Sequence, residues 1–289
     1  MTQTDALSQT ASPAVEAPPR KKSQVLRYTK KALKRLIPLG LLAYFVPKIL
    51  IAYAILGLID VARNRPFAWS TLQRYFFGNG ILTWLLSPFN LLMDLLSLPY
   101  WNKGIYKQTD LPQKYQTEVQ ALIDACHNRD LVGALESKMG EKKRGMFFFQ
   151  WYGKIIQTSI DIPEFKTRYK YIRTIGVSIF NKRQSTAKHY GPLRVTFRML
   201  YNINTIDDPN VYVQVGDHVN RWRDSKLFIF DDTLQHESHN ESDGIRYCLF
   251  VDMLRPSLIP WFFSAMVTAF RLVLAPIRRV FYKHWTMIK

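Results

Sequence analysis

Apolar residues form long blocks near both ends of the chain and a series of short runs between them. The first block covers residues 36–61 and is interrupted by Pro47 and Lys48, and the second covers residues 67–101. A helix that spans a bilayer needs ~20 largely apolar residues. Both blocks have this length, although the first carries a charge near its middle. We therefore expect membrane-associated helices over residues 36–102.

Aromatic and basic residues extend this prediction. Trp69, Trp84, Tyr100 and Trp101 are placed like interfacial anchors around the second block. Eight Lys or Arg residues directly precede the first block: Arg20, Lys21, Lys22, Arg27, Lys30, Lys31, Lys34 and Arg35. These flanks favour a hairpin in the inner (cytoplasmic) membrane, with the following domain in the cytosol. The alternative is that both blocks are buried helices of a helical subdomain.

The two ends of the chain differ from each other in character. Residues 1–35 begin with an Ala-, Thr-, Ser- and Pro-rich stretch and become basic, which predicts a disordered segment and not a secretory signal. Residues 257–289 are apolar at first and later carry Arg278, Arg279, Lys283 and Lys289. This pattern is typical of an interfacial amphipathic helix. A helix that packs on the central domain is the alternative.

The central region, residues 103–256, has the pattern of a mainly β domain. A helix is expected over residues 111–128, and short β runs are expected over residues 145–153, 169–180, 196–202, 211–215, 227–230 and 246–252. Several short strands with turn residues between them and one helix nearby favour a sandwich or a barrel over a parallel sheet.

The charge balance and the cysteine count narrow the class of protein. The chain has 40 Lys and Arg residues against 22 Asp and Glu residues, a net charge of +18. Such a charge attracts nucleic acid or anionic lipid. Because the basic residues border apolar, aromatic-rich segments, we expect anionic membrane lipids as partners and no nucleic acid. Cys126 and Cys248 alone indicate neither a disulfide framework nor a zinc site.

Two histidines and an arginine are the candidates for chemistry. His189 precedes Tyr190-Gly191-Pro192, His236 follows an apolar run that ends in Asp231-Asp232, and Arg246 comes ten positions later. Imidazole is a ligand that suits Fe(II), and non-haem iron sites usually add a carboxylate near the first histidine. Here that place is Gly191. Taken singly, each histidine is better explained as a core or surface residue than as a metal ligand.

The whole set of motifs resembles the aspartyl/asparaginyl β-hydroxylase family of Fe(II)- and 2-oxoglutarate-dependent dioxygenases, which includes membrane-bound lipid A hydroxylases. The spacing matches without gaps over residues 178–198 and 230–256. The matching residues are Ser178, His189-Tyr190-Gly191-Pro192, Arg198, Trp222-Arg223-Asp224-Ser225-Lys226, Phe230-Asp231-Asp232-Thr233-Leu234-Gln235-His236-Glu237 and Arg246.

This resemblance implies a double-stranded β-helix, a jelly roll of the cupin type, with an iron site and a co-substrate site. By similarity, His189 and His236 would ligate Fe(II), as in the family's two-histidine variant. Ser178 and Arg246 would hold the distal carboxylate of 2-oxoglutarate, because an Arg fork binds a carboxylate bidentately. Arg198 would face the other end of 2-oxoglutarate.

Four further positions qualify the resemblance. The family carries a histidine that contacts the oxoacid where this chain has Leu200. His239 is a possible replacement, although a loop position would leave it solvated. Asp231 and Asp232 are expected to cap a turn and to orient His236.

The function that follows is a membrane-associated dioxygenase that consumes O2 and 2-oxoglutarate and hydroxylates an unactivated C–H bond. The first hypothesis is a lipid acyl chain as substrate, on lipid A or an aminolipid. The second is an Asp or Asn side chain of a protein. The third is a catalytically inactive membrane scaffold, which the leucine at position 200 suggests.

Overall fold

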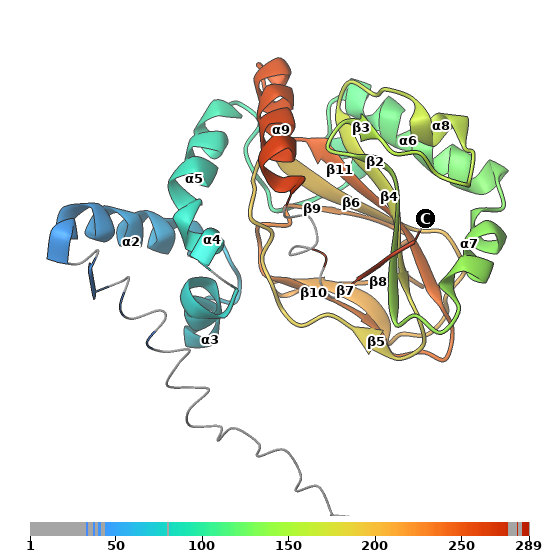
Figure 1. The fold of residues 1–289 in the computed structure, drawn as a ribbon, viewed down its shortest axis with the longest axis horizontal. Helices are drawn as coiled ribbons and strands as arrows, with labels where there is room; N and C mark the ends of the chain where they lie inside the picture. The colour runs from blue at the N-terminus through green and yellow to red at the C-terminus, as the bar shows by residue number, and fades with distance from the viewer. Residues whose placement is uncertain are drawn as a thin grey trace, which may run out of the picture. The chain divides into compact units, whose positions relative to one another are not determined.

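The computed structural model describes residues 33, 37, 40, 41, 44–79, 81–276, 282 and 285–288. The chain divides into two compact units, residues 1–51 and residues 52–289. The second unit is mainly β and consists of two sheets with helices around them (Figure 1). Except for Leu33, the predicted disordered segment over residues 1–35 lies outside the described residues.

The two sheets are largely antiparallel and differ in size. In the described residues the large sheet has the order β1 (Ile105–Tyr106), β9 (Leu227–Phe230), β6 (Thr196–Asn202), β11 (Arg246–Leu254), β4 (Ile172–Phe180), β2 (Arg144–Trp151) and β12 (Thr286–Met287), with β3 (Lys154–Ile155) also paired to β2. The small sheet has the order β5 (Gln184–Ser185), β10 (His236–Asn240), β7 (Val211–Val215) and β8 (His218–Arg221). The prediction of a mainly β domain is confirmed.

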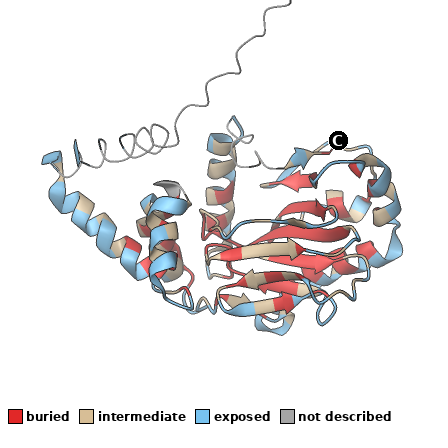
Figure 2. Cartoon of the chain, turned by 90° about the horizontal axis from the view of Figure 1, so that it is seen from below, coloured by how far each residue is buried: buried red, intermediate tan, exposed pale blue. Residues whose placement is uncertain are grey.

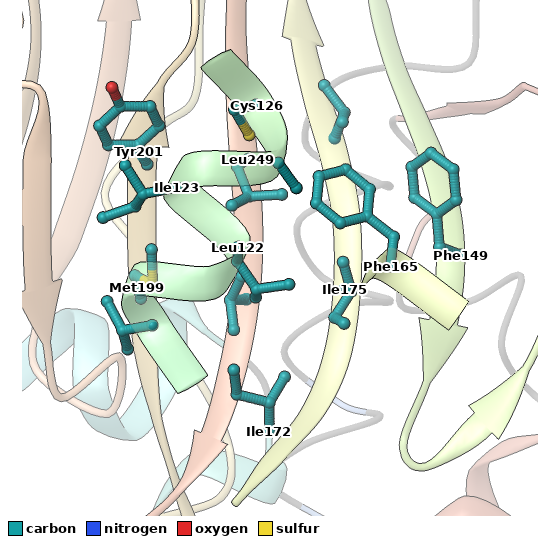
Figure 3. Packing of buried hydrophobic residues seen from close by; sticks show 14 of the residues in the cluster. Leu122, Ile123, Cys126, Phe149, Phe165, Ile172, Ile175, Met199, Tyr201 and Leu249 are labelled. Carbon is teal, nitrogen blue, oxygen red and sulfur yellow. The ribbon is translucent and has the colours of Figure 1, made fainter. Parts of the chain in front are cut away.

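Helices cover the outer face of the large sheet. Side chains of α6 such as Leu122 and Ile123 pack on Met199, Tyr201 and Leu249 of the sheet (Figure 3). The helices on this face are α6 (Gln113–Asn128), α7 (Leu131–Met139) and α8 (Pro163–Lys166). Burying one such side chain stabilises the fold by roughly 1.5–3 kcal/mol.

The inner face of the large sheet packs against the small sheet. Successive residues of a strand point to opposite faces, so β11 turns Leu249 toward the helices and Cys248 and Phe250 toward the small sheet. Val213 and Val215 of the small sheet belong to the same inner cluster. The central strands are therefore buried on both faces (Figure 2). Any polar side chain on an inner face must find its partners inside the protein.

The second apolar block forms short helices instead of a long one. It contains α3 (Trp69–Gln73), a π-helix (Arg74–Gly78), α4 (Ile81–Leu85) and α5 (Ser87–Leu96), and α2 (Pro47–Val61) precedes them. Tyr75 packs with Val61 and Tyr190, and Met93 packs with Leu193 and Leu254. Part of the apolar bulk is thus used for packing within the second unit, whereas Phe67, Trp69, Leu95 and Trp101 of the block are exposed.

No helix among the described residues combines the length and the apolar character that a bilayer crossing requires. The prediction of an inner-membrane location is therefore wrong, and the spanning hairpin over residues 36–102 is not confirmed. The prediction failed because the apolar residues are divided among separate helices, of which α2 has 15 residues, α5 has 10, and α3 and α4 have 5 each. Local hydropathy does not show where a helix ends.

The C-terminal helix packs on the β domain. In α9 (Pro260–Leu274), Phe263 and Val267 are buried against Leu193, Val195 and Leu254, as the alternative interpretation expects. Trp261, Leu272 and Val273 are exposed on the same helix. The basic residues expected after it, Arg278, Arg279, Lys283 and Lys289, lie outside the described residues.

Candidate active site

The side chains of His189 and His236 lie against each other at the small sheet, where His236 begins β10. Their backbones form a reciprocal bridge, in which each N–H donates to the other residue's carbonyl oxygen at 2.9 Å. The ring centroids are 4.2 Å apart, and the His236 ring also packs on Phe230 at 5.3 Å. The structure therefore brings together the two histidines that the motif pattern singled out.

Both imidazoles are held in one tautomer by the backbone. Nδ1 of His189 lies 2.8 Å from the Ala187 carbonyl oxygen, and Nδ1 of His236 lies 2.8 Å from the Leu234 carbonyl oxygen. A carbonyl oxygen can only accept, so Nδ1 carries the proton and Nε2 keeps its lone pair. Metal-bound histidines commonly have this arrangement.

Burial keeps both rings neutral. It lowers the pKa of His189, and Arg198 and Arg144 lower it further. The pKa of His236 is well below its ordinary value because of burial and, next, the neighbouring His189. Neutral imidazole is the form that binds a metal ion. No group of three or more His, Cys, Asp or Glu side chains suited to a metal ion occurs among the described residues, so the pair would need other ligands.

The carboxylate of Asp232 lies beside Gly191, the position at which non-haem iron sites usually have a carboxylate ligand. A Cβ at Gly191 would lie 2.5 Å from Oδ2 of Asp232, and the Gly191 N–H donates to the Asp232 carbonyl oxygen at 2.7 Å. Burial raises the pKa of Asp232 to about 7, although Arg198 acts to lower it. The space that a larger side chain at position 191 would occupy is therefore taken by Asp232.

Arg246 is a buried cation without a carboxylate partner among the described residues. Its side chain is 1% exposed, and its guanidinium lies 3.9 Å above the Phe180 ring. Nη2 donates to Ser178 Oγ at 3.4 Å, Nη1 donates to Ser238 Oγ, and Nε has no hydrogen-bond partner. Burial lowers its pKa. Buried charges are normally paired, so this guanidinium is suited to bind an anion.

Ser238 is a site residue that the motif comparison missed. It lies on β10 two positions after His236, so both side chains point to the same face of the small sheet. Ser238 thereby connects the histidine strand to Arg246 on the large sheet. A signal was available in the period-two spacing, but the strand His236–Asn240 lacks apolar residues and was not predicted as a strand.

Arg198 has carboxylate partners within the protein. Its Nε donates to Asp252 at 2.7 Å, its Nη2 donates to Asp232 at 2.9 Å, and its guanidinium lies 3.9 Å above the Phe250 ring. Leu200, two residues further along β6, packs in the inner apolar cluster. The predicted contact between Arg198 and 2-oxoglutarate would therefore compete with two existing ion pairs.

Two expectations for neighbouring residues are only partly met. Asp231 caps its turn by accepting from Thr233 N–H and Oγ–H, but it pairs with Arg63 and Arg194 and does not orient His236. His239 lies on strand β10 and not on a loop. Its ring stacks on Tyr212 with 4.6 Å between centroids, on the face opposite to Ser238.

Residues 118–256 match the family model described as aspartyl/asparaginyl β-hydroxylase. This part of the chain belongs to that family. A stretch of 91 residues of the chain is 32% identical to the ornithine lipid ester-linked acyl 2-hydroxylase of Rhizobium tropici. That match covers 31% of this chain and 32% of the relative, so the chain spans about a third of the length of the curated relative it matches.

Similarities to solved structures are weak. The protein TT1209 from Thermus thermophilus is 16% identical, with 44% of this chain and 98% of that chain covered and a TM-score of 0.29. A prolyl hydroxylase from Trichoplax adhaerens, in complex with a hypoxia inducible factor peptide, is 13% identical over 60% of this chain and 93% of that chain, with a TM-score of 0.29.

Proposed function

We propose that this protein is an Fe(II)- and 2-oxoglutarate-dependent dioxygenase that hydroxylates an unactivated C–H bond in a lipid acyl chain. We also propose that the two sheets form the double-stranded β-helix of such enzymes, within the domain over residues 103–256. The proposal rests on one observation. The two neutral imidazoles of His189 and His236 lie near the buried guanidinium of Arg246, which has no carboxylate partner among the described residues and is hydrogen-bonded to Ser238 on the strand of His236.

The donor set fits a ferrous ion. The Nε2 atoms of His189 and His236 would supply two ligands, and a chelating oxoacid would supply two more, so three protein ligands are not required. Fe(II) with 2-oxoglutarate and O2 would supply the oxidation, which yields succinate and CO2 and places one oxygen atom in the substrate C–H bond.

The anion site fits the distal carboxylate of 2-oxoglutarate. Arg246 would donate to that carboxylate through its guanidinium, and Ser178 and Ser238 hold the guanidinium in place. The Phe180 ring beneath it excludes water from one side. Charge-assisted hydrogen bonds are stronger in such a desolvated setting than at a surface.

The lipid substrate is supported by the relative's name and by the apolar surroundings of the site. The relative acts on an ester-linked acyl chain of ornithine lipid. In this chain Phe230, Phe250 and Leu200 line the inner cluster beside the histidines. A hydrocarbon chain could contact these side chains without leaving a buried polar group unpaired.

The test is turnover by the purified full chain with Fe(II), 2-oxoglutarate, O2 and ornithine lipid. We expect succinate and a lipid that is 16 Da heavier on an acyl chain, and we expect neither product from His189→Ala. If an Asp- or Asn-containing peptide is oxidised and the lipid is not, the substrate proposal is wrong and the second hypothesis holds. Absence of iron binding would favour the inactive scaffold.

A further inference from the structure

Tyr152 occupies an unfavourable backbone conformation for its residue type. It is the first of two residues that join β2 to β3, and its φ is +45°, followed by Gly153 with φ +75°. Tight two-residue hairpins with positive φ at both positions strongly prefer Asn-Gly. A tyrosine there is disfavoured by the steric demand of its Cβ. The chain nevertheless has an aromatic ring at this turn.

The Tyr152 ring lies where two apolar clusters meet. It packs with the inner cluster, which includes Phe148 and Phe250, and with the helix cluster formed by Leu193, Phe263 and their neighbours. The Trp151 ring is 5.0 Å away. Tyr152 therefore separates the inside of the hydroxylase domain from the packing surface of α5 and α9.

The backbone of Tyr152 is connected to the row of residues that leads to the histidines. Its N–H donates to Thr174 Oγ at 3.4 Å, and Thr174 pairs in register with Asp252. Asp252 on β11 lies opposite Arg198 on β6, and Arg198 lies opposite Phe230 on β9. The Phe230 ring packs on His236. The charges of Asp252 and Asp232 also act on the Tyr152 hydroxyl, whose pKa is raised first by burial.

On its other side Tyr152 adjoins exposed apolar residues of α9. Arg271 Nη1 donates to the Tyr152 carbonyl oxygen at 3.3 Å. The next two residues, Leu272 and Val273, are 68% and 67% exposed, and Leu274 packs with both apolar clusters. The Tyr152 ring thus contacts both the inner cluster and the cluster to which α9 contributes.

We propose that Tyr152 is a substrate-positioning residue, whose ring limits how far an acyl chain advances toward His189 and His236 and so determines which carbon is hydroxylated. This inference rests on the proposed function. It explains why an aromatic ring is present at a turn that Asn would form more easily. A purely structural ring would affect stability without affecting the position of the product hydroxyl.

Two substitutions in the full chain separate these roles. Tyr152→Asn removes the ring and suits the turn, whereas Tyr152→Phe keeps the ring and removes the hydroxyl. Arg183→Asn is the matched control, because Arg183 also has positive φ (+52°) but forms an exposed ion pair with Asp243. We expect all three variants to fold and to bind Fe(II) and 2-oxoglutarate like the wild type.

The decisive readout is the position of the new hydroxyl on ornithine lipid, measured by tandem mass spectrometry. We expect one position for the wild type, Tyr152→Phe and Arg183→Asn, and several positions for Tyr152→Asn. Succinate released per hydroxylated lipid should rise severalfold in Tyr152→Asn. An unchanged single position and unchanged succinate ratio in Tyr152→Asn would overturn the inference.

A binding measurement keeps the inference testable if the wild type does not oxidise ornithine lipid. Palmitate is titrated into the iron-free proteins by calorimetry. We expect the dissociation constant to rise at least fivefold in Tyr152→Asn and to stay unchanged in Tyr152→Phe. Equal affinity in all variants, or no binding to the wild type, would overturn the inference. A failure of turnover with the expected binding pattern would instead reject the reaction proposed above.

Discussion

Arg246 is the residue whose environment most directly points to a ligand. A buried charge normally has an opposite charge beside it, but the described partners of Arg246 are two hydroxyls and an aromatic ring. The hydroxyls orient the guanidinium without neutralising it. A carboxylate from outside the chain would complete the pairing.

Replacing Arg246 by Ala should therefore weaken co-substrate binding strongly. Truncating one partner of a buried charged pair reduces affinity by roughly 2–5 kcal/mol, so the 2-oxoglutarate concentration for half-maximal succinate release should rise at least 30-fold. Ser238→Ala should cause a smaller rise, because it misplaces the guanidinium without removing it. An unchanged requirement in Arg246→Ala would show that the carboxylate binds elsewhere.

Each histidine of the pair should be necessary for metal binding. Because His189 and His236 both direct a deprotonated Nε2 away from the backbone, His189→Ala or His236→Ala should abolish binding of Co(II), followed by its visible absorption. His239→Ala is the control, since its ring stacks on Tyr212 on the other face of β10. Retained Co(II) affinity in either of the first two variants would contradict the ligand assignment.

At the residue scale, the motif spacing grouped polar residues that lie together in the structure. Ser178 and Arg246 are hydrogen-bonded to each other, and His189 contacts His236. Their roles as ligands of 2-oxoglutarate and iron stay predictions. Ser238 was missed because the polar strand His236–Asn240 was not predicted as a strand. The role of Asp231 was mistaken because its partner Arg194 is distant in the sequence.

At the scale of elements, the short N-terminal helices are tied to the β domain by a buried cluster of charges. Arg194 is 1% exposed and pairs with three carboxylates, and Arg255 pairs with one of them, Asp94. The carboxylates are Asp60 from α2, Asp94 from α5 and Asp231 after β9. Burial acts to raise the pKa of Asp94, but Arg194 and Arg255 outweigh it and hold that pKa below its ordinary value.

Removing a carboxylate from this cluster should destabilise the fold. Asp94→Ala leaves two buried guanidiniums undercompensated, so the free energy of unfolding should fall by roughly 3 kcal/mol in urea titrations at neutral pH. Because the folded pKa of Asp94 is depressed, its contribution is present at neutral pH and is lost as the pH falls, so the difference should narrow below a pH of about 4. Asp243→Ala, in an exposed pair, is the control. Equal unfolding midpoints for Asp94→Ala and the wild type would refute the structural role.

Elements were predictable where burial produces a sequence pattern. The strands Thr196–Asn202, Val211–Val215 and Leu227–Phe230 were predicted with the bounds observed. Strand β8 (His218–Arg221) and strand β10 were missed, because their residues are largely polar and their pairing partners are remote in the sequence. The apolar helices were assigned to a membrane because local hydropathy does not show that these helices end after 5 to 15 residues.

At the scale of the whole second unit, the site depends on the two sheets together. The large sheet carries Ser178, Arg198 and Arg246, and the small sheet carries His236 and Ser238. Neither sheet alone holds both a metal ligand and the anion-binding guanidinium. The sheet arrangement could not be derived from strand patterns alone, whereas the motif resemblance already grouped these residues, except Ser238, in one predicted site.

The account is tested most directly by an anaerobic titration of the purified full chain with Fe(II) and then 2-oxoglutarate, followed by calorimetry and visible absorption. We predict equimolar binding of iron, followed by equimolar binding of 2-oxoglutarate with a new charge-transfer band. The band should be absent in His236→Ala, and in Arg246→Ala it should require a much higher 2-oxoglutarate concentration. Iron binding that persists in His236→Ala, or a wild type that binds neither iron nor 2-oxoglutarate, would contradict the central claim.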